Sequence, residues 1–193
     1  MRSDPFVDPL QFLTACHGRI RARLFTFLRT AARLRERGAE VERHELEAAL
    51  LFFRTSGEGH TIDEERSLYP RLRVRLVEAG QEEAVALLDR IVHEHRDHEA
   101  LFERLGAAMA AIDPTLGTGD GLPDPDAPKI ACGTPEGRAL ADALEAIVAD
   151  YESHIPEEDD VIYPLAAQLM PADELAQVAA EMRGRRKIGR KLL

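Results

Sequence analysis

The sequence HTIDEERSLYP, from His60 to Pro70, recurs as HIPEEDDVIYP from His154 to Pro164. Both copies read His-x-x-x-Glu-acid-x-x-aliphatic-Tyr-Pro. A His and a Glu four residues apart lie on one face of an α-helix, one turn apart, so each copy can present an imidazole and a carboxylate to the same point. The repeat therefore predicts two helices that together offer two imidazoles and two carboxylates.

The apolar residues around each copy indicate that this face is buried. The stripe through the second copy comprises Leu140, Leu144, Ile147, Tyr151, His154, Glu158, Val161 and Leu165, and the stripe through the first comprises Leu46, Leu50, Phe53, Gly57, His60, Glu64 and Leu68. Alternating steps of three and four are typical of the face that a helix turns toward a core. Because a buried carboxylate without a partner is unstable, we expect both Glu side chains to be protonated, ion-paired or bound to a cation.

Two further apolar stripes contain histidines. One precedes the first copy and includes His17, and the other precedes the second copy and includes His95 and His98. The chain is thus a tandem duplication, in which a helix with a buried His is followed by a helix with His-x-x-x-Glu. Antiparallel packing of four such helices would bring together six side chains: His17, His60, Glu64, His95, His154 and Glu158.

Four imidazoles and two carboxylates suit two transition-metal ions better than one. Imidazole favours iron, zinc, copper or nickel, and a carboxylate can bridge two ions. No Cys lies in these stripes, which argues against a structural thiolate zinc site. Such a centre leaves room for a bridging oxygen and for an added ligand. The alternative is a buried network of His and Glu without metal.

These residues resemble the hemerythrin-like, or HHE cation-binding, domains over roughly residues 8–170. The resemblance rests on His17, on the two repeats, and on Glu94-His95-Arg96 in the third helix. It implies an all-α, antiparallel four-helix bundle with a non-haem centre of two iron ions, joined by an oxo or hydroxo bridge. In that centre Glu64 and Glu158 would bridge the irons, and His17, His60, His95 and His154 would be terminal ligands.

The sequence departs from the oxygen-carrying hemerythrins, which have a His-x-x-x-His pair in the third helix, because the residue four after His95 is Glu99. It looks more similar to the four-His branch that includes the Repair of Iron Centers proteins, although the small amino-terminal domain with paired cysteines is not found. The resemblance implies a protein that binds O2, NO or peroxide in sensing or stress response. The alternatives are iron donation for iron-sulfur cluster repair, or peroxide consumption by a di-iron oxidoreductase. We assign no residue a catalytic role.

Several polar residues near the expected ligands allow two interpretations. His98 is interpreted as a core residue or a hydrogen-bond partner of a ligand, with a fifth His ligand as the alternative. Glu99 lies at the edge of its stripe and is expected to be solvated or to hydrogen-bond a ligand, with a role as a metal ligand as the alternative. Tyr69 and Tyr163 are expected to pack where each helix meets Pro, unless their hydroxyls hydrogen-bond the metal ligands. The acids that follow the repeat glutamates, Glu65 and Asp159, are expected at the surface.

The composition fits a single domain over residues 1–193. A chain of 193 residues with 45% hydrophobic residues can bury one core. The net charge of -10 disfavours nucleic acids and anionic membranes as partners. No apolar run approaches the roughly 20 residues of a membrane span, and residues 1–9 lack the apolar region of a signal peptide. With only two cysteines, we expect a cytoplasmic protein.

Turn-forming residues divide the chain into five helices. We expect them over residues 8–38, 39–69, 81–112, 134–170 and from 171 onward, with an exposed loop at 113–133. Pro156 should bend its helix. The last helix leads into a basic tail of Arg183, Arg185, Arg186, Lys187, Arg190 and Lys191. This tail is expected to be solvated, with docking to an acidic protein partner or to the protein's own acidic surface as alternatives.

Overall fold

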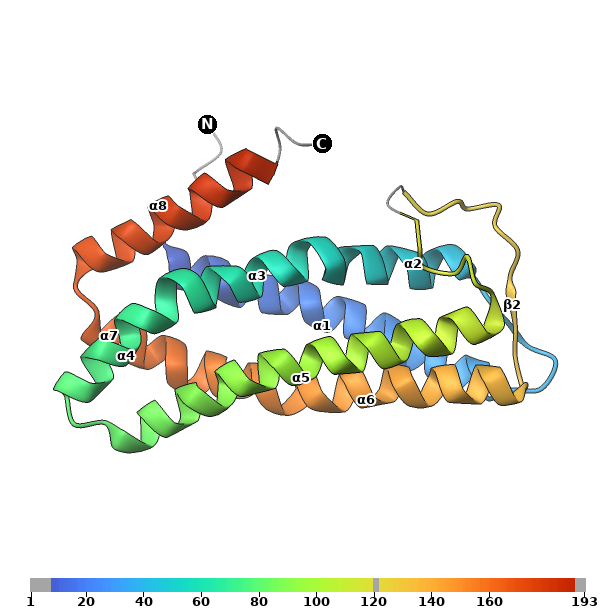
Figure 1. Cartoon of the computed structure of the whole chain (residues 1–193), viewed down its shortest axis with the longest axis horizontal. Coiled ribbons are helices and arrows are strands. Elements are labelled where there is room, and N and C mark those ends of the chain that lie inside the picture. The colour runs from blue at the N-terminus through green and yellow to red at the C-terminus, as the bar shows by residue number, and fades with distance from the viewer. Residues whose placement is uncertain (1–7, 120–121, 190–193) are drawn as a thin grey trace. The chain divides into compact units, whose positions relative to one another are not determined.

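The computed structural model describes residues 8–119 and 122–189, with side chains described as far as residue 186, and is an all-α helical bundle (Figure 1). Its α-helices are α1 (Pro9–Leu34), α2 (Arg43–Phe52), α3 (Glu58–Asp63), α4 (Tyr69–Glu78), α5 (Glu82–Ile112), α6 (Pro135–Glu157), α7 (Tyr163–Leu169) and α8 (Ala172–Gly189). Three π-helical segments join some of them: η1 (Phe53–Gly57), η2 (Glu64–Leu68) and η3 (Glu158–Ile162). Within the described ranges, no helix is both long and apolar enough to cross a membrane.

The chain forms two compact units, and α1, α5 and α6 each run through both. Unit 1 comprises the described parts of Met1–Gly18, Glu58–Glu94 and His154–Leu193. Unit 2 comprises Arg19–Gly57 and His95–Ser153. Both His-x-x-x-Glu repeats therefore belong to unit 1, whereas His95 and His98 belong to unit 2. A single domain over residues 1–193 stays a prediction.

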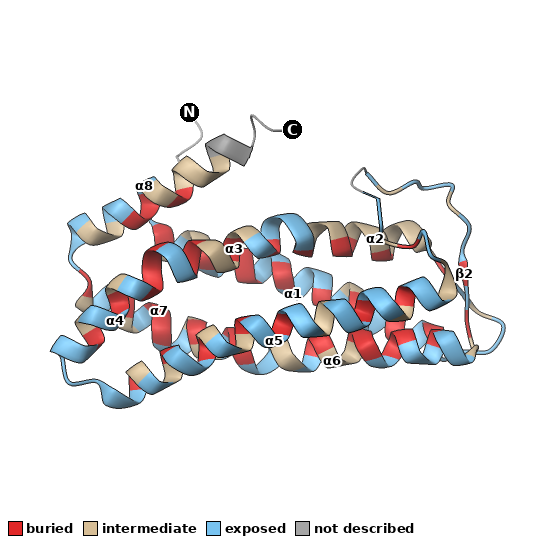
Figure 2. Ribbon diagram, viewed as in Figure 1, coloured by how far each residue is buried: buried red, intermediate tan, exposed pale blue. Residues whose placement is uncertain are grey.

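The core of unit 1 is built from apolar residues of α1, η2, α4, α5, η3, α7 and α8 (buried residues are red in Figure 2). Its members include Leu13 from α1, Leu72 from α4, Leu88 from α5, and Ile162 from η3. The C-terminal helix α8 adds Val178, Ala179 and Met182, all of them buried. Full burial of an aliphatic side chain contributes about 1.5–3 kcal/mol, so α8 is a structural part of this unit.

Unit 2 contains a short β-ribbon that the sequence did not indicate. The strands β1 (Glu40–Val41) and β2 (Ile130–Ala131) are antiparallel, with Val41 opposite Ile130. The prediction of an exposed loop over residues 113–133 is therefore wrong in part, since Leu116, Ile130 and Cys132 are buried. Strands this short carry no periodic pattern, which explains why they were missed.

The π-helical segments η2 and η3 occupy the same place in both repeats. Each begins at the repeat Glu, and the backbone N–H of the following Tyr donates to the carbonyl of that Glu: Tyr69 to Glu64, and Tyr163 to Glu158. The next residue is a Pro, which lacks an N–H and normally clashes with a preceding carbonyl. The wide turn accommodates Pro70, and the helix continues to Glu78. The predicted helix end at Tyr69 is therefore wrong.

The wide turn also changes which residues face the core after the repeat Glu. One extra residue per turn rotates the following side chains by about 100°. Val161 was predicted in the buried stripe, yet it is 38% exposed, while its neighbour Ile162 is fully buried. Likewise Ala166 is buried where Leu165 was expected. The predicted stripe is thus correct up to Glu158 and shifted by one residue beyond it.

Candidate metal centre

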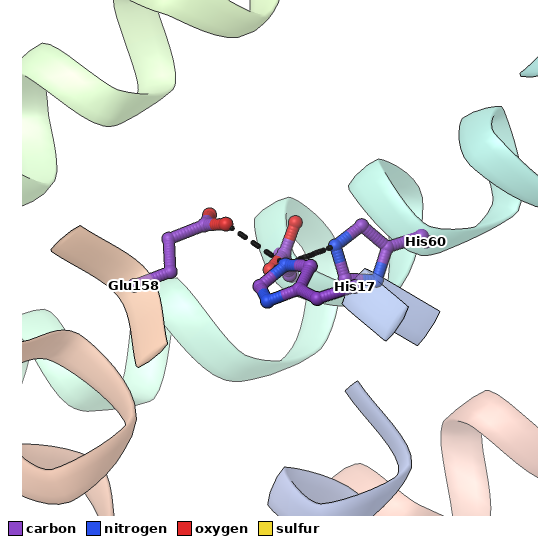
Figure 3. A group of neighbouring side chains, drawn as sticks. His17, His60 and Glu158 are labelled. Atoms are coloured by element: carbon purple, nitrogen blue, oxygen red, sulfur yellow. Dashed lines mark hydrogen bonds and ion pairs between the residues drawn. The ribbon is translucent and has the colours of Figure 1, made fainter. Parts of the chain in front are cut away.

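Four side chains from unit 1 converge on one point in its core. They are His17 from α1, His60 from α3, Glu64 from η2 and Glu158 from η3, all buried, and one ligand atom of each lies within 4.8 Å of the others. Figure 3 shows His17 facing both His60 and Glu158. The Nε2 atom of His17 lies 3.0 Å from Nε2 of His60 and 3.1 Å from Oε2 of Glu158. The cluster thus places imidazole nitrogens and carboxylate oxygens where one cation could contact them all.

Each repeat forms the His and Glu pair that its spacing predicts. In the first copy, Nε2 of His60 lies 3.4 Å from Oε1 of Glu64. In the second copy, Nε2 of His154 lies 3.3 Å from Oε1 of Glu158. Five of the six predicted ligands therefore lie in one group of mutually contacting side chains in unit 1.

Two carboxylates outside the cluster orient its histidines. The Nδ1 atom of His17 lies 2.8 Å from Oδ1 of Asp159, and Nδ1 of His154 lies 3.0 Å from Oε2 of Glu94. When Nδ1–H donates to a carboxylate, the lone pair of Nε2 is directed into the cluster, as in metal sites whose histidines are held by carboxylates. The prediction that Asp159 is a surface acid is therefore wrong, whereas Glu65 is exposed as expected.

The repeat tyrosines connect the two copies to each other. The hydroxyl of Tyr69 donates to Glu158, and the hydroxyl of Tyr163 donates to Glu64, so each Tyr bonds the carboxylate of the other copy. Both tyrosines are buried, and the ring of Tyr163 stacks on His17 with centroids 5.4 Å apart. The tyrosines therefore both pack and make the hydrogen bonds that the sequence left as the alternative.

Burial and charge set the protonation of the metal-free cluster. Burial, together with the charge of Glu158, raises the pKa of Glu64 well above its ordinary value. Burial also acts to raise the pKa of Glu158, but the hydrogen bonds of His154 and His17 hold it well below its ordinary value. For His154, burial lowers the pKa, but hydrogen bonds with Glu158 and Glu94 raise it to about 9. Protons thus compensate the buried carboxylates when no metal is bound, and metal binding would release them.

The remaining predicted residues, His95, His98 and Glu99, belong to unit 2. His95 is buried in α5, one residue after Glu94, and belongs to unit 2, so its role as a ligand stays a prediction. His98 is buried in unit 2, where its Nε2 lies 2.5 Å from Oδ2 of Asp150 and its ring stacks on Tyr151 with centroids 4.3 Å apart. These contacts agree with the interpretation of His98 as a core residue. Glu99 is exposed, as expected.

The basic tail is not the solvated end that was expected. Arg185 and Arg186 both bind the buried carboxylate of Asp63, at 2.8 Å each. Sequence reasoning missed Asp63, because nothing local shows that an acid beside Glu64 meets a helix more than a hundred residues later. The side chain of Lys187, and residues Arg190 and Lys191, lie outside the described part of the chain.

The donor set fits a borderline transition-metal ion. Imidazole nitrogens and carboxylate oxygens suit iron, zinc and manganese, and the cluster contains no thiolate of the kind found in structural zinc sites. The short distance between the two Nε2 atoms of His17 and His60 supports this fit. Two lone pairs that face each other at this distance repel unless a proton or a cation lies between them.

Comparison with known proteins identifies the family. The model of the hemerythrin HHE cation-binding domain matches residues 8–166, and it matches a second time over residues 87–193. The first match covers both repeats, and the overlap of the two agrees with a duplicated helix pair. Searches of curated proteins and of solved structures give no significant match. With its duplicated His-x-x-x-Glu helices and its buried His and Glu cluster, the chain belongs to the hemerythrin HHE cation-binding domain family.

Proposed function

We propose that this protein binds a pair of iron ions, with Glu64 and Glu158 as bridging carboxylates. The terminal ligands of the pair are His17, His60, His95 and His154. The observation that carries the proposal is the orientation of the histidines: Asp159 and Glu94 hold Nδ1 of His17 and His154, which leaves Nε2 of each directed at the carboxylates. With both carboxylates shared and two imidazoles on each ion, each ion would have about four protein donors.

A carboxylate-bridged iron pair supplies redox chemistry and a coordination position for a small ligand, here O2, NO or peroxide. The chain's own residues prepare the site for that ligand. The hydroxyls of Tyr69 and Tyr163 hold Glu158 and Glu64 in place, and the site lies in a buried unit whose apolar core includes Leu13, Leu68 and Ile162. In a dry core, electrostatic contacts with a bound ligand are stronger than in water.

We propose that the protein binds this ligand in the cytoplasm, in sensing or stress response, without turning it over. The burial of the cluster between the two repeats supports the binding of a small ligand. We also propose that the basic residues of the C-terminal segment bind a protein partner. The net charge of -10 argues against nucleic acid and anionic membranes as partners.

Metal analysis of protein purified without a metal-chelating tag tests the core of the proposal. After reconstitution with ferrous iron, we expect about two irons per chain, with near-ultraviolet charge-transfer absorption on oxidation. Metal binding at such a site is strongly coupled to folding, so the folded protein should take up iron. Fewer than about half an equivalent of iron per chain would refute the metal centre. One reproducible zinc per chain would refute the iron pair.

Titration of the reduced protein with O2, NO and peroxide tests the use of the centre. Saturable, reversible spectral changes without consumption of the ligand are expected. Catalytic consumption of peroxide would assign an oxidoreductase, and transfer of iron to an acceptor under reducing conditions would assign an iron donor. Either result contradicts a binding role and leaves the metal site intact.

Metal removal should destabilise the protein. A ligand at 1,000 times its dissociation constant stabilises the native state by about 4 kcal/mol, so metal-free protein should melt at a clearly lower temperature. The difference should grow as the pH rises through the region where Glu64 and His154 lose their protons, because those protons compensate the metal-free cluster. Thermal melts of both forms at several pH values measure it, and equal melting temperatures would indicate a network of His and Glu without metal.

A further inference from the structure

The C-terminal helix α8 packs against the helical run that carries His60 and Glu64, within unit 1 (Figure 1). It contacts α3 and η2, the two segments that contain these ligands. Val178 and Met182 of α8 are fully buried in the core of the unit. Apolar packing therefore fixes the helix next to the proposed metal centre. Its polar contacts reach the residues around His60 and Glu64.

The central polar contact is a clamp of two arginines on Asp63. Asp63 is fully buried and directly precedes Glu64. Its Oδ1 accepts from Nε of Arg185, and its Oδ2 accepts from Nη2 of Arg186, each at 2.8 Å. A buried carboxylate with both oxygens bound to guanidinium groups has little freedom to move, because breaking either bond leaves a buried charge without compensation.

The clamp extends to the wide turn that begins at Glu64. Nη2 of Arg185 donates to Oγ of Ser67 at 2.7 Å, and Oγ of Ser67 donates to Oε2 of Glu181 at 2.6 Å. Ser67 lies inside η2, so α8 binds the residue before the turn and a residue within it. The turn that carries Glu64 is thus held from the side of α8 at two points.

The backbone of α3 is also shaped to admit the clamp. A Cβ atom at Gly59 would collide with Nη1 of Arg186, so the absence of a side chain there lets the guanidinium reach Asp63. Arg186 also lies over the ring of Phe12 of α1, with 5.7 Å from its Cζ to the ring centroid. Gly59 directly precedes the ligand His60, so the same helical turn both binds Arg186 and carries a ligand.

We infer that Asp63 is a positioning residue that couples α8 to the metal centre. The clamp fixes the turn that directs His60 and Glu64 into the cluster, and metal binding in turn holds α8 in place. Coupling between two binding events is reciprocal, so whatever α8 contributes to metal affinity, metal contributes to the docking of α8. The inference rests on the proposed metal site and assigns the C-terminal helix, which lies outside the four-helix repeat, a role in it.

The same helix supplies a matched control. Glu174 of α8 binds Arg75 of α4, with 3.3 Å between Nε and Oε2, at a part of the interface that holds no predicted ligand. The Glu174→Gln variant therefore weakens the docking of α8 without touching the turn at Glu64. Asp63→Asn weakens docking at that turn. A purely structural role of α8 would make the two variants alike.

Cobalt(II), which binds imidazole and carboxylate sites in place of iron(II), is the probe. Asp63→Asn should weaken cobalt affinity about 10- to 100-fold, the usual loss when a group that holds a ligand is removed. Glu174→Gln should stay within about fivefold of the unmodified protein, as for a partly exposed ion pair. Equal losses in both variants would overturn the inference.

Amide hydrogen exchange over residues 172–186 supplies the second readout. Cobalt should slow exchange in this segment in the unmodified protein and in Glu174→Gln, and should have little effect in Asp63→Asn. If amide exchange in α8 is the same with and without cobalt, the coupling is overturned, but the metal site is not contradicted. Failure of the unmodified protein to bind cobalt or iron would instead refute the metal site itself.

Gly59→Ala covers the case in which Asp63→Asn fails to fold. Alanine favours a helix over glycine, so this variant should not lose thermal stability through helix propensity, yet its Cβ displaces Arg186. Reduced cobalt affinity is expected in Gly59→Ala protein that still unfolds in one cooperative transition without metal. Unchanged affinity in a folded Gly59→Ala protein, with Arg186 displaced, would contradict the clamp as the means of coupling.

Discussion

The two His-x-x-x-Glu copies share their pattern, their wide turn and their Tyr-Pro ending, yet they differ in how their carboxylates are held. Glu158 faces two imidazoles, His17 at 3.1 Å and His154 at 3.3 Å, and its pKa lies well below the ordinary value. Glu64 faces His60 at 3.4 Å, and burial with the charge of Glu158 raises its pKa well above the ordinary value. The two carboxylates occupy equivalent places in the sequence, yet the structure favours the protonated form of Glu64 and the charged form of Glu158.

The acids that flank these glutamates differ in the same way. Asp63 precedes Glu64 and is clamped by α8, whereas Glu157, at the same place in the second copy, pairs with Arg90 near the surface at 2.7 Å. Asp159 follows Glu158 and holds His17, whereas Glu65 is exposed. The first copy is thus supported through the residue before its Glu, and the second through the residue after it.

The largest effect is expected from removing either bridging carboxylate. Glu64→Ala and Glu158→Ala should each reduce the site to one metal or none, because the lost donor is shared by both ions. Glu158→Ala should retain less metal, since it also removes the partner of His17 and His154. Metal content after ferrous reconstitution measures both, with Glu65→Ala as the control that keeps two irons. If Glu65→Ala empties the site and Glu64→Ala does not, the assignment of ligands on this helix is wrong by one residue.

The opposite pKa shifts can be separated in metal-free protein. Glu158→Gln should lose about 2 kcal/mol of stability at neutral pH, because hydrogen bonds between charged groups are lost. The folded pKa of Glu158 is depressed, so its contribution is present above the unfolded pKa and disappears as the pH falls through the folded value. Glu64→Gln should lose less stability at the same pH, since the raised pKa of Glu64 favours its protonated form, which the neutral amide resembles. Urea denaturation across pH measures both, and equal losses at neutral pH would contradict the asymmetry.

A smaller effect is expected from the acids that follow the repeat glutamates. Asp159→Ala should weaken metal affinity about 10- to 100-fold, because His17 loses the carboxylate that orients it. Glu65→Ala should leave affinity unchanged. Competition with a chromophoric chelator distinguishes them, whereas a fully loaded sample would not. Equal affinities would show that Asp159 does not orient His17 in solution.

The smallest effects are expected from the tyrosines. Tyr69→Phe and Tyr163→Phe should each lose about 0.5–1.5 kcal/mol of stability, the usual net value of one hydrogen bond, and retain both metals. Each mutation should change the environment of the Glu in the opposite copy. Tyr69→Phe should therefore shift the infrared bands of the Glu158 carboxylate. The infrared carboxylate bands of the two variants report this, and a change confined to the mutated copy would contradict the crossed bonds.

The sequence predicted the helices well because a long apolar period is a strong signal. It also predicted the buried His and Glu cluster of unit 1, since His17, His60, Glu64, His154 and Glu158 interrupt that period. It failed after Glu158, where the wide turn of η3 shifts the buried face from Val161 to Ile162. A π-helical turn depends on backbone hydrogen bonds that no residue pattern displays.

The hydrogen-bond partners of this cluster were harder to predict than the cluster itself. Glu94 and Asp159 hold imidazoles from other helices, and Asp63 meets Arg185 and Arg186 across a long stretch of sequence. Such contacts depend on how helices are rotated against each other, and the residues themselves look like ordinary surface acids and bases. The ligand role of His95, in the other unit, stays a prediction.

The crossed hydrogen bonds of Tyr69 and Tyr163 have a consequence for folding. Each tyrosine donates to the carboxylate of the copy to which it does not belong, so buried hydrogen bonds join the two copies. A fragment that ends between the copies would lose both crossed hydrogen bonds, from Tyr69 to Glu158 and from Tyr163 to Glu64. The duplicated halves are therefore interdependent, and unit 1 should fold and unfold as one cooperative piece rather than copy by copy.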